Sequence, residues 1–139
     1  MKQNDNLSLS DMEYKINRAE CYFRAKAKSY IPARVSYYAR QMKVSYGKIT
    51  IRDQKTRWGS RSNSGTLSFN WRLMLAPKEV LDYVVVHELA HIKQMNHSKA
   101  FWAEVEKIMP DYKIYREWLK VHGNELTKEE AVRQIYRDN

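Results

Sequence analysis

The first third of the chain has the apolar spacing of an amphipathic helix. Its apolar residues lie three or four positions apart: Ile16, Ala19, Phe23 and Ala27. Lys and Arg occupy the other faces, as expected for a helix with one side against a core. Ser10 is a residue type that caps helix N-termini, and Pro32 suits the first turn of a second helix. The pattern predicts two helices over residues 10–44.

After Gly47 the apolar residues follow a two-residue period. The clearest run alternates with polar residues and comprises Leu67, Phe69, Trp71 and Leu73. Strict alternation is typical of a strand, and Ser62–Gly65 has the composition of a turn. We predict a small antiparallel sheet within residues 47–73, with strands at 47–53, 56–60 and 66–72.

Helical spacing returns in the last part of the chain, residues 77–139. Pro77 is placed to open a helix, and Pro110 interrupts a later helical stretch that begins at Ser98. The pattern resumes to His122, and Gly123 ends it before a further short helix. Helices, a small sheet and more helices predict one α+β domain over residues 1–139.

The positive charge lies in the N-terminal part. Residues 14–61 contain 13 Lys and Arg against two acidic residues, whereas residues 62–139 contain 11 of each. This excess suggests an acidic partner, with nucleic acid the first candidate. The predicted contacts are on the N-terminal helices: Arg24, Lys26, Lys28, Arg34 and Arg40. A solvated helix face is the alternative interpretation.

The sequence predicts a cytoplasmic protein without a membrane-spanning segment. No apolar stretch is long enough to cross a bilayer, and the N-terminal residues lack the apolar core of a signal peptide. Cys21 is the only cysteine, so no internal disulfide can form. A reducing compartment fits best.

The sequence His87-Glu88-Leu89-Ala90-His91 has the H-E-x-x-H pattern. On a helix, His87 and His91 lie one turn apart on one face and can both bind a zinc ion. Glu88 points about 100° away around the helix, beside an open coordination position. There it can take a proton from a water that the metal has acidified. The apolar flanks predict a buried helix, in which these polar groups need a partner.

A catalytic zinc usually has three protein ligands, so a third is expected nearby. His97 follows His91 by six residues, and Asn96 and Ser98 around it indicate that the chain turns there. The turn can bring His97 back to the metal. A carboxylate on the next helix, Glu104 or Glu106, is the alternative ligand.

The motifs together resemble the YgjP-like metallopeptidase family, relatives of the SprT-type zinc metalloproteases. The resemblance includes His87–His91, His97–Trp102, Thr56–Ser60 and Leu67–Leu73. Arg61 departs from the family pattern, which commonly has a cysteine after Trp-Gly-Ser. The resemblance implies a zincin-like fold in which strand 66–72 lines the cleft and pairs with an extended substrate. Its predicted contacts are Ser68, Phe69 and Asn70.

The predicted function is zinc-dependent hydrolysis of a peptide or protein, with Glu88 as general base and one zinc per chain. The oxyanion of the transition state needs a donor, and four side chains are candidates: Tyr112, Tyr115, Arg57 and Asn70. One alternative is a nucleic-acid-binding protein with a structural zinc. Another is a peptidase brought to DNA or RNA by its basic N-terminal part.

Overall fold

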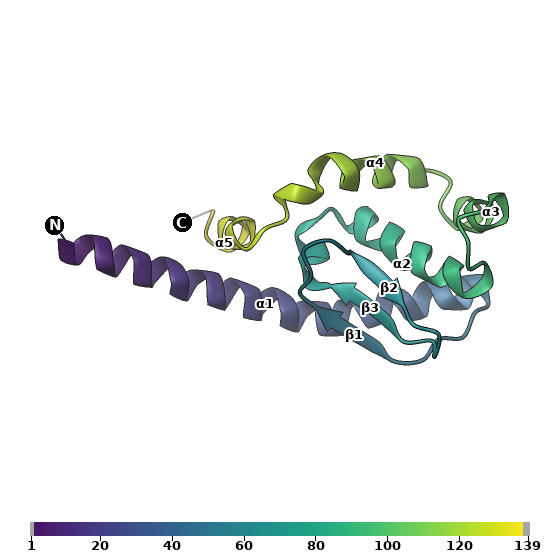
Figure 1. Ribbon diagram of the computed structural model, residues 1–139, viewed down its shortest axis with the longest axis horizontal. Helices are drawn as coiled ribbons and strands as arrows, with labels where there is room; N and C mark the ends of the chain where they lie inside the picture. Colours follow the sequence, from purple (N-terminus) through teal and green to yellow (C-terminus); the bar gives the residue numbers. More distant parts are fainter. Residues whose placement is uncertain (1, 138–139) are drawn as a thin grey trace.

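The computed structural model describes residues 2–137, with side chains from Leu9 onward. Helices pack against a three-stranded sheet (Figure 1), which confirms the α+β class. The elements in chain order are α1 (Lys2–Met42), β1 (Ile49–Arg52), β2 (Gly59–Arg61), β3 (Leu67–Asn70), the 3-10 helix η1 (Trp71–Leu75), α2 (Lys78–Lys93), α3 (Lys99–Ile108), α4 (Tyr112–His122), the 3-10 helix η2 (Gly123–Glu125) and α5 (Lys128–Tyr136).

The N-terminal part is one helix, so the prediction of two helices with starts at Ser10 and Pro32 is wrong. Pro32 lies inside α1. The buried face continues past it without a break and comprises Ala19, Phe23, Ala27, Ile31, Val35, Ala39 and Met42. Contact of this face with the core along its whole length outweighs the cost of the proline.

The sheet is mixed, and the prediction of purely antiparallel strands is wrong. The strand order is β1-β3-β2, with β3 antiparallel to β2 and parallel to β1. The turn between β2 and β3 is as predicted, and Gly65 adopts a φ of 88° there. Alternation identifies a strand but not its neighbours, and the chain inserts β3 between the two earlier strands.

Helix α2, which carries the H-E-x-x-H pattern, packs between α1, the sheet and α4. An ion pair fixes it to α1, because Arg34 Nε and Nη2 donate to the two oxygens of Asp82 at 3.0 and 2.9 Å. The Tyr38 hydroxyl donates to the same carboxylate at 2.9 Å. Burial, with the charge of Asp82, raises the pKa of Tyr38 to about 12, so this donor keeps its proton.

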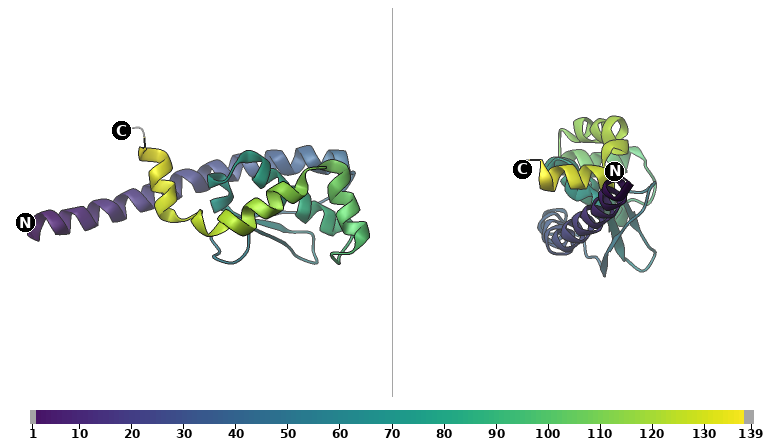
Figure 2. Two further views of the ribbon diagram at one scale, coloured as in Figure 1. Left: turned by 90° about the horizontal axis from the view of Figure 1, so that it is seen from above. Right: turned by 90° about the vertical axis from the view of Figure 1, so that its left-hand side faces the viewer.

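The C-terminal helices follow the predicted pattern. Helix α3 ends before Pro110, α4 ends at His122, and α5 is the further short helix. Helix α4 passes above α2 in Figure 1, and α5 crosses α1 in Figure 2 and packs against it. The N-terminal end of α1 extends beyond the rest of the molecule. Within the described residues, no helix has the length and apolar character needed to span a membrane.

Candidate metal centre

Two histidines project from one face of α2. His87 and His91 are one turn apart, and their ring centroids are 4.8 Å apart. The helix is buried on most sides, with Val85, Val86 and Leu89 fully enclosed. The apolar contacts of α2 therefore fix the direction in which both imidazoles point.

His97 comes from the loop that follows α2. The helix ends at Lys93, and Ser98 caps α3 by accepting a hydrogen bond from the Phe101 amide at 3.3 Å. This turn brings the Nε2 atom of His97 to 3.1 Å from that of His91. One nitrogen from each of the three histidines lies within 4.8 Å of the others. The turn predicted around Asn96 and Ser98 is thus present.

The three nitrogens fit a divalent metal such as zinc in donor type, and the His91–His97 pair also fits it in spacing. Two nitrogens at zinc-ligand distance from one tetrahedral ion lie about 3.4 Å apart. The 3.1 Å separation of His91 and His97 is close to this value. Burial, together with the charge of His87, lowers the pKa of His91, which favours the neutral imidazole that binds metal.

The alternative carboxylate ligands lie outside this cluster. Glu104 Oε2 forms an ion pair with Lys93 Nζ at 3.3 Å, and Glu106 is exposed on α3. In the part of the chain with described side chains, the histidine cluster includes neither of them. The geometry therefore favours His97 over both glutamates as third ligand.

Glu88 is buried beside the cluster, with 6% of its surface exposed. Its Oε2 atom is 3.3 Å from the Nδ1 atom of His87. On its other side Glu88 faces β2, where a Cβ atom added to Gly59 would lie 3.0 Å from Glu88 Cγ and 3.1 Å from Oε2. The absence of a side chain at Gly59 lets the edge strand approach the glutamate this closely.

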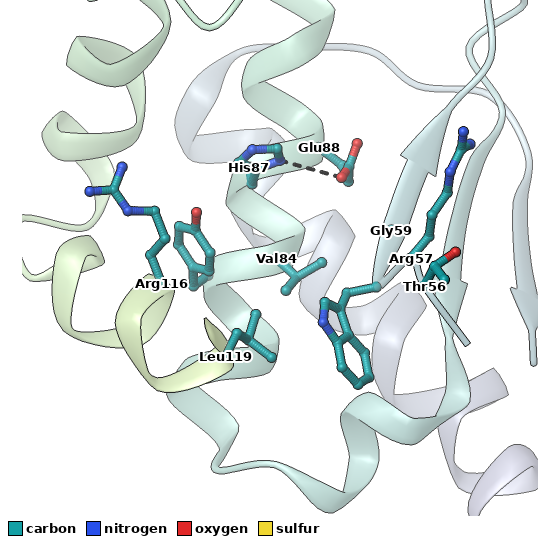
Figure 3. Close-up of a pocket in the computed structure, with 10 residues that line it drawn as sticks. Thr56, Arg57, Gly59, Val84, His87, Glu88, Arg116 and Leu119 are labelled. Atoms are coloured by element: carbon teal, nitrogen blue, oxygen red, sulfur yellow. Dashed lines mark hydrogen bonds and ion pairs between the residues drawn. The ribbon is translucent and has the colours of Figure 1, made fainter. Parts of the chain in front are cut away.

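Two neighbouring cavities form a cleft along this site. The first, of about 310 Å³, lies between β2 and α4, and the second, of about 360 Å³, lies between β2 and the three histidines. Both are lined by the same four residues at their meeting point: Arg57, Gly59, His87 and Glu88. Figure 3 shows His87 and Glu88 between Arg116 on one wall and Arg57 on the other.

Two residues that line this cleft, Tyr83 and Arg116, were not predicted from the sequence. Tyr83 lies one turn before His87 on α2, a spacing that could have identified it. Burial raises the pKa of Tyr83 to about 12, although the nearby charge of Arg116 acts to lower it. Arg116 comes from α4, and its guanidinium lies over the rings of Trp102 and Tyr112, 4.8 and 5.5 Å from their centroids. The sequence offers no signal for Arg116, because its position depends on how α4 packs.

Of the four candidate oxyanion donors, Arg57 is the one that lines both cavities. The Asn70 side-chain amide instead donates to the backbone carbonyls of Gln54 and Arg57. Its Oδ1 atom caps η1 by accepting a hydrogen bond from the backbone amide of Arg72. Tyr112 is buried beneath Trp102, and Tyr115 lines neither cavity. The amide of Asn70 thus holds the segment that carries Arg57.

The prediction that strand 66–72 pairs with substrate is wrong. This strand is β3, the central one, and its neighbours β1 and β2 occupy both of its edges. Ser68, Phe69 and Asn70 are all buried, and the Ser68 hydroxyl bonds to Thr50 Oγ1 at 2.7 Å. The strand at the cleft is β2, because it forms the sheet edge beside α2.

The five basic residues proposed to contact nucleic acid differ in their surroundings. Arg34 is committed to the ion pair with Asp82, and Arg24 pairs with Glu20 at 3.4 Å. Lys26, Lys28 and Arg40 are exposed on α1. Nucleic-acid binding stays a prediction, with fewer available cations than the sequence suggested.

Comparison with known proteins gives a consistent result. The sequence model of the YgjP-like metallopeptidase domain matches residues 1–122. The structure is similar to the crystal structure of the metallopeptidase zymogen abylysin of Pyrococcus abyssi, with 27% identity and a TM-score of 0.59 over 66% of this chain and 95% of that one. It is also similar to the crystal structure of the metallopeptidase zymogen jannalysin of Methanocaldococcus jannaschii, with 26% identity and a TM-score of 0.56 over 66% of this chain and 92% of that one. No curated protein matches the chain.

Proposed function

Because the chain belongs to the YgjP-like metallopeptidase family and is a metal-dependent peptidase, we propose that it hydrolyses peptide bonds with one zinc ion held by His87, His91 and His97. Glu88 is the general base. The observation that carries this assignment is the burial of Glu88 between the histidine cluster and Gly59 of β2. A buried carboxylate beside a metal-binding histidine cluster is placed for proton transfer within the cleft.

Each group in the cleft has a distinct role in this mechanism. Zinc would supply Lewis acidity and lower the pKa of a water that it binds. Glu88 takes the proton from the attacking water and passes it to the leaving nitrogen. Arg57 lies where the two cavities meet and donates hydrogen bonds to the oxyanion that develops on the carbonyl oxygen.

The edge strand β2 is placed to align the substrate. Its three residues, Gly59–Arg61, all line the second cavity, and β2 forms one edge of the sheet. An extended peptide can add to this edge through backbone hydrogen bonds, which give affinity with little sequence preference. Side chains in the cleft must then supply any selectivity.

The Glu88→Gln variant tests the general base. We expect it to retain zinc, because no metal ligand changes, and to lose turnover by at least about 10²-fold, as is typical of general-base removal. Peptide cleavage and elemental analysis on the same preparation measure both quantities. Full activity in the zinc-loaded variant would remove Glu88 from the mechanism.

The His97→Ala variant tests the third ligand. We expect about one zinc per wild-type chain and a large loss in the variant, since two histidines alone hold zinc weakly. Glu104→Ala is the matched control and should keep its zinc. Equal zinc content in wild type and His97→Ala would instead assign the third ligand to another residue.

A further inference from the structure

The cleft carries more positive charge than the hydrolysis itself needs. Three arginines line its two cavities: Arg57, Arg61 and Arg116. Among the described residues that line them, Glu88 is the sole carboxylate. The chain as a whole has a net charge of +9, which also attracts acidic ligands. With Arg57 assigned to the oxyanion, Arg61 and Arg116 remain without a role.

Arg116 is fixed in place without an acidic partner. Its guanidinium lies over Trp102 and Tyr112, and Trp102 and Tyr112 are themselves stacked at 5.2 Å. Across residues 9–137, no ion pair involves Arg116. The aromatic rings position the cation while leaving its hydrogen-bond donors available.

Arg61 also has hydrogen-bonding capacity that the protein leaves unused. It stands on β2 opposite Leu67, and its Nη1 atom donates to the Ser62 carbonyl at 3.2 Å. Its Nε atom is the one buried side-chain donor or acceptor without a partner in the part of the chain whose side chains are described. The buried Nε atom is closed to a ligand, so Arg61 can bind one only through its terminal guanidinium nitrogens, and Arg61 lines the second cavity.

The two arginines lie on opposite sides of the reacting centre. Arg116 lines the first cavity and not the second, whereas Arg61 lines the second and not the first. Glu88 and His87 lie where the cavities meet. A peptide that crosses this point therefore places side chains before and after the scissile bond near different arginines.

We propose that the cleft selects peptides with acidic side chains on both sides of the scissile bond, one bound by Arg116 and the other by Arg61. This proposal rests on the peptidase function proposed above. A free C-terminal carboxylate has the same chemistry but would engage one arginine only. Carboxylates on both sides require internal Asp or Glu residues, and the cleft extends in both directions from Glu88.

The expected preference is moderate, because both arginines are partly or fully accessible to solvent. An exposed ion pair contributes up to about 1 kcal/mol, which corresponds to about fivefold in affinity per arginine. A peptide with Glu on both sides should thus bind more tightly than its Gln counterpart by up to about 25-fold if the two pairs are independent.

The test uses fluorescence-quenched peptides that carry Glu or Gln at each of three positions on either side of the scissile bond. All are amidated at the C-terminus, and a parallel set has free carboxylates. We expect kcat/KM to favour Glu at one position on each side, in the amidated set. Arg116→Gln should abolish the preference on one side and Arg61→Gln on the other.

Matched variants distinguish recognition from misfolding. Arg116→Lys retains the charge and should keep most of the preference. Lys120→Gln removes an exposed charge from the same helix, outside both cavities, and should change nothing. Equal rates for Glu and Gln peptides would overturn the proposal. So would a preference that survives both glutamine variants, or one found only with free C-terminal carboxylates.

Binding to the zinc-loaded Glu88→Gln variant separates this proposal from the peptidase function. Fluorescence anisotropy of the same peptides reports affinity without turnover. Tighter binding of the Glu peptides supports acidic selection even if the wild type cleaves none of them, a result that would count against the peptidase function alone. Equal affinities, or no binding of either peptide, would overturn acidic selection.

Discussion

At the scale of single residues, Gly59 shows how the fold brings a strand to Glu88, the proposed general base. A Cβ atom at this position would lie 3.0 Å from Glu88 Cγ and 3.1 Å from Val84 Cγ1. Contacts this short force a neighbour to move, and Val84 lies on the buried helix α2. Both neighbours are buried on α2, but the Glu88 side chain has more rotatable bonds than that of Val84 and would be the one to shift. In the proposed mechanism this shift would carry its carboxylate away from the attacking water.

We expect Gly59→Ala to lower kcat/KM by about 10²-fold, because a displacement of about 1 Å in a catalytic group can have this effect. Zinc content should stay at the wild-type level, since no ligand is touched. Gly47→Ala is the matched control, because its nearest neighbours would be 3.4 Å away. Wild-type activity in Gly59→Ala would show that Glu88 tolerates the extra methyl group.

The sequence predicted the residues whose relation is local. His87, Glu88 and His91 follow from helical spacing, and the turn at Ser98 indicated that His97 could return to them. Arg116 and Arg61 could not be assigned in this way. Their places in the cleft depend on how α4 packs over α2 and on which strand forms the sheet edge.

At the scale of elements, the helices were predictable because each carries its own period and its own end signals. The strand pattern located three strands but gave no information on their order, and the family resemblance placed β3 at the cleft instead of β2. Pro32 has the residue type of a helix start but lies inside α1. A local signal for a helix start was overridden by an apolar face that continues from Ala19 to Met42.

The position of Pro32 leads to a prediction about stability. Proline in a helix interior costs about 3 kcal/mol relative to alanine, because it removes a hydrogen bond and clashes with the preceding turn. Its rigidity also restricts the unfolded chain, which offsets up to about 1 kcal/mol. We expect Pro32→Ala to raise the free energy of unfolding by about 2–3 kcal/mol.

Urea unfolding followed by circular dichroism measures this change. Lys28→Ala is a suitable control, because Lys28 is exposed on the same helix and should change stability by less than about 0.5 kcal/mol. Lower stability of Pro32→Ala would mean that the proline supports a bend that the native packing requires.

At the scale of the whole molecule, a group of charges joins α1, the end of β1, η1 and α5. Lys128 lies 3.2 Å from Glu20 and 3.7 Å from Asp53, and Arg72 lies 3.1 Å from Asp53. The Trp71 indole donates to the same carboxylate at 2.9 Å. Burial alone would raise the pKa of Asp53, but the indole donor and the two cations outweigh it and hold the pKa below its ordinary value of 3.8.

The lowered pKa predicts a pH-dependent contribution to stability. The ionised carboxylate stabilises the fold fully above the unfolded-state pKa, and this contribution is lost as the pH falls through the lower folded-state pKa. We expect Asp53→Asn to lower the free energy of unfolding at pH 7 by about 1 kcal/mol, so that the variant unfolds at a lower urea concentration than the wild type. The stability difference between the two proteins should disappear below about pH 4.

Urea midpoints between pH 2.5 and pH 7 test this expectation. Asp11→Asn is the control, because Asp11 forms an exposed pair with Lys15 on α1 and should have little effect at any pH. A gap between Asp53→Asn and wild type that is constant down to pH 2.5 would contradict a role for the charge.

Trp102 connects the metal site to the selectivity that we propose. Its ring stacks on His97 at 5.9 Å and lies beneath the guanidinium of Arg116. A side chain shared by two binding events makes them thermodynamically linked, and linkage is reciprocal. Whatever factor the metal adds to the affinity for an acidic peptide, the peptide must add to the affinity for the metal. Because a bound cation attracts the carboxylates of an acidic peptide, this coupling should be positive, and a chelator should remove the metal less readily while such a peptide occupies the cleft.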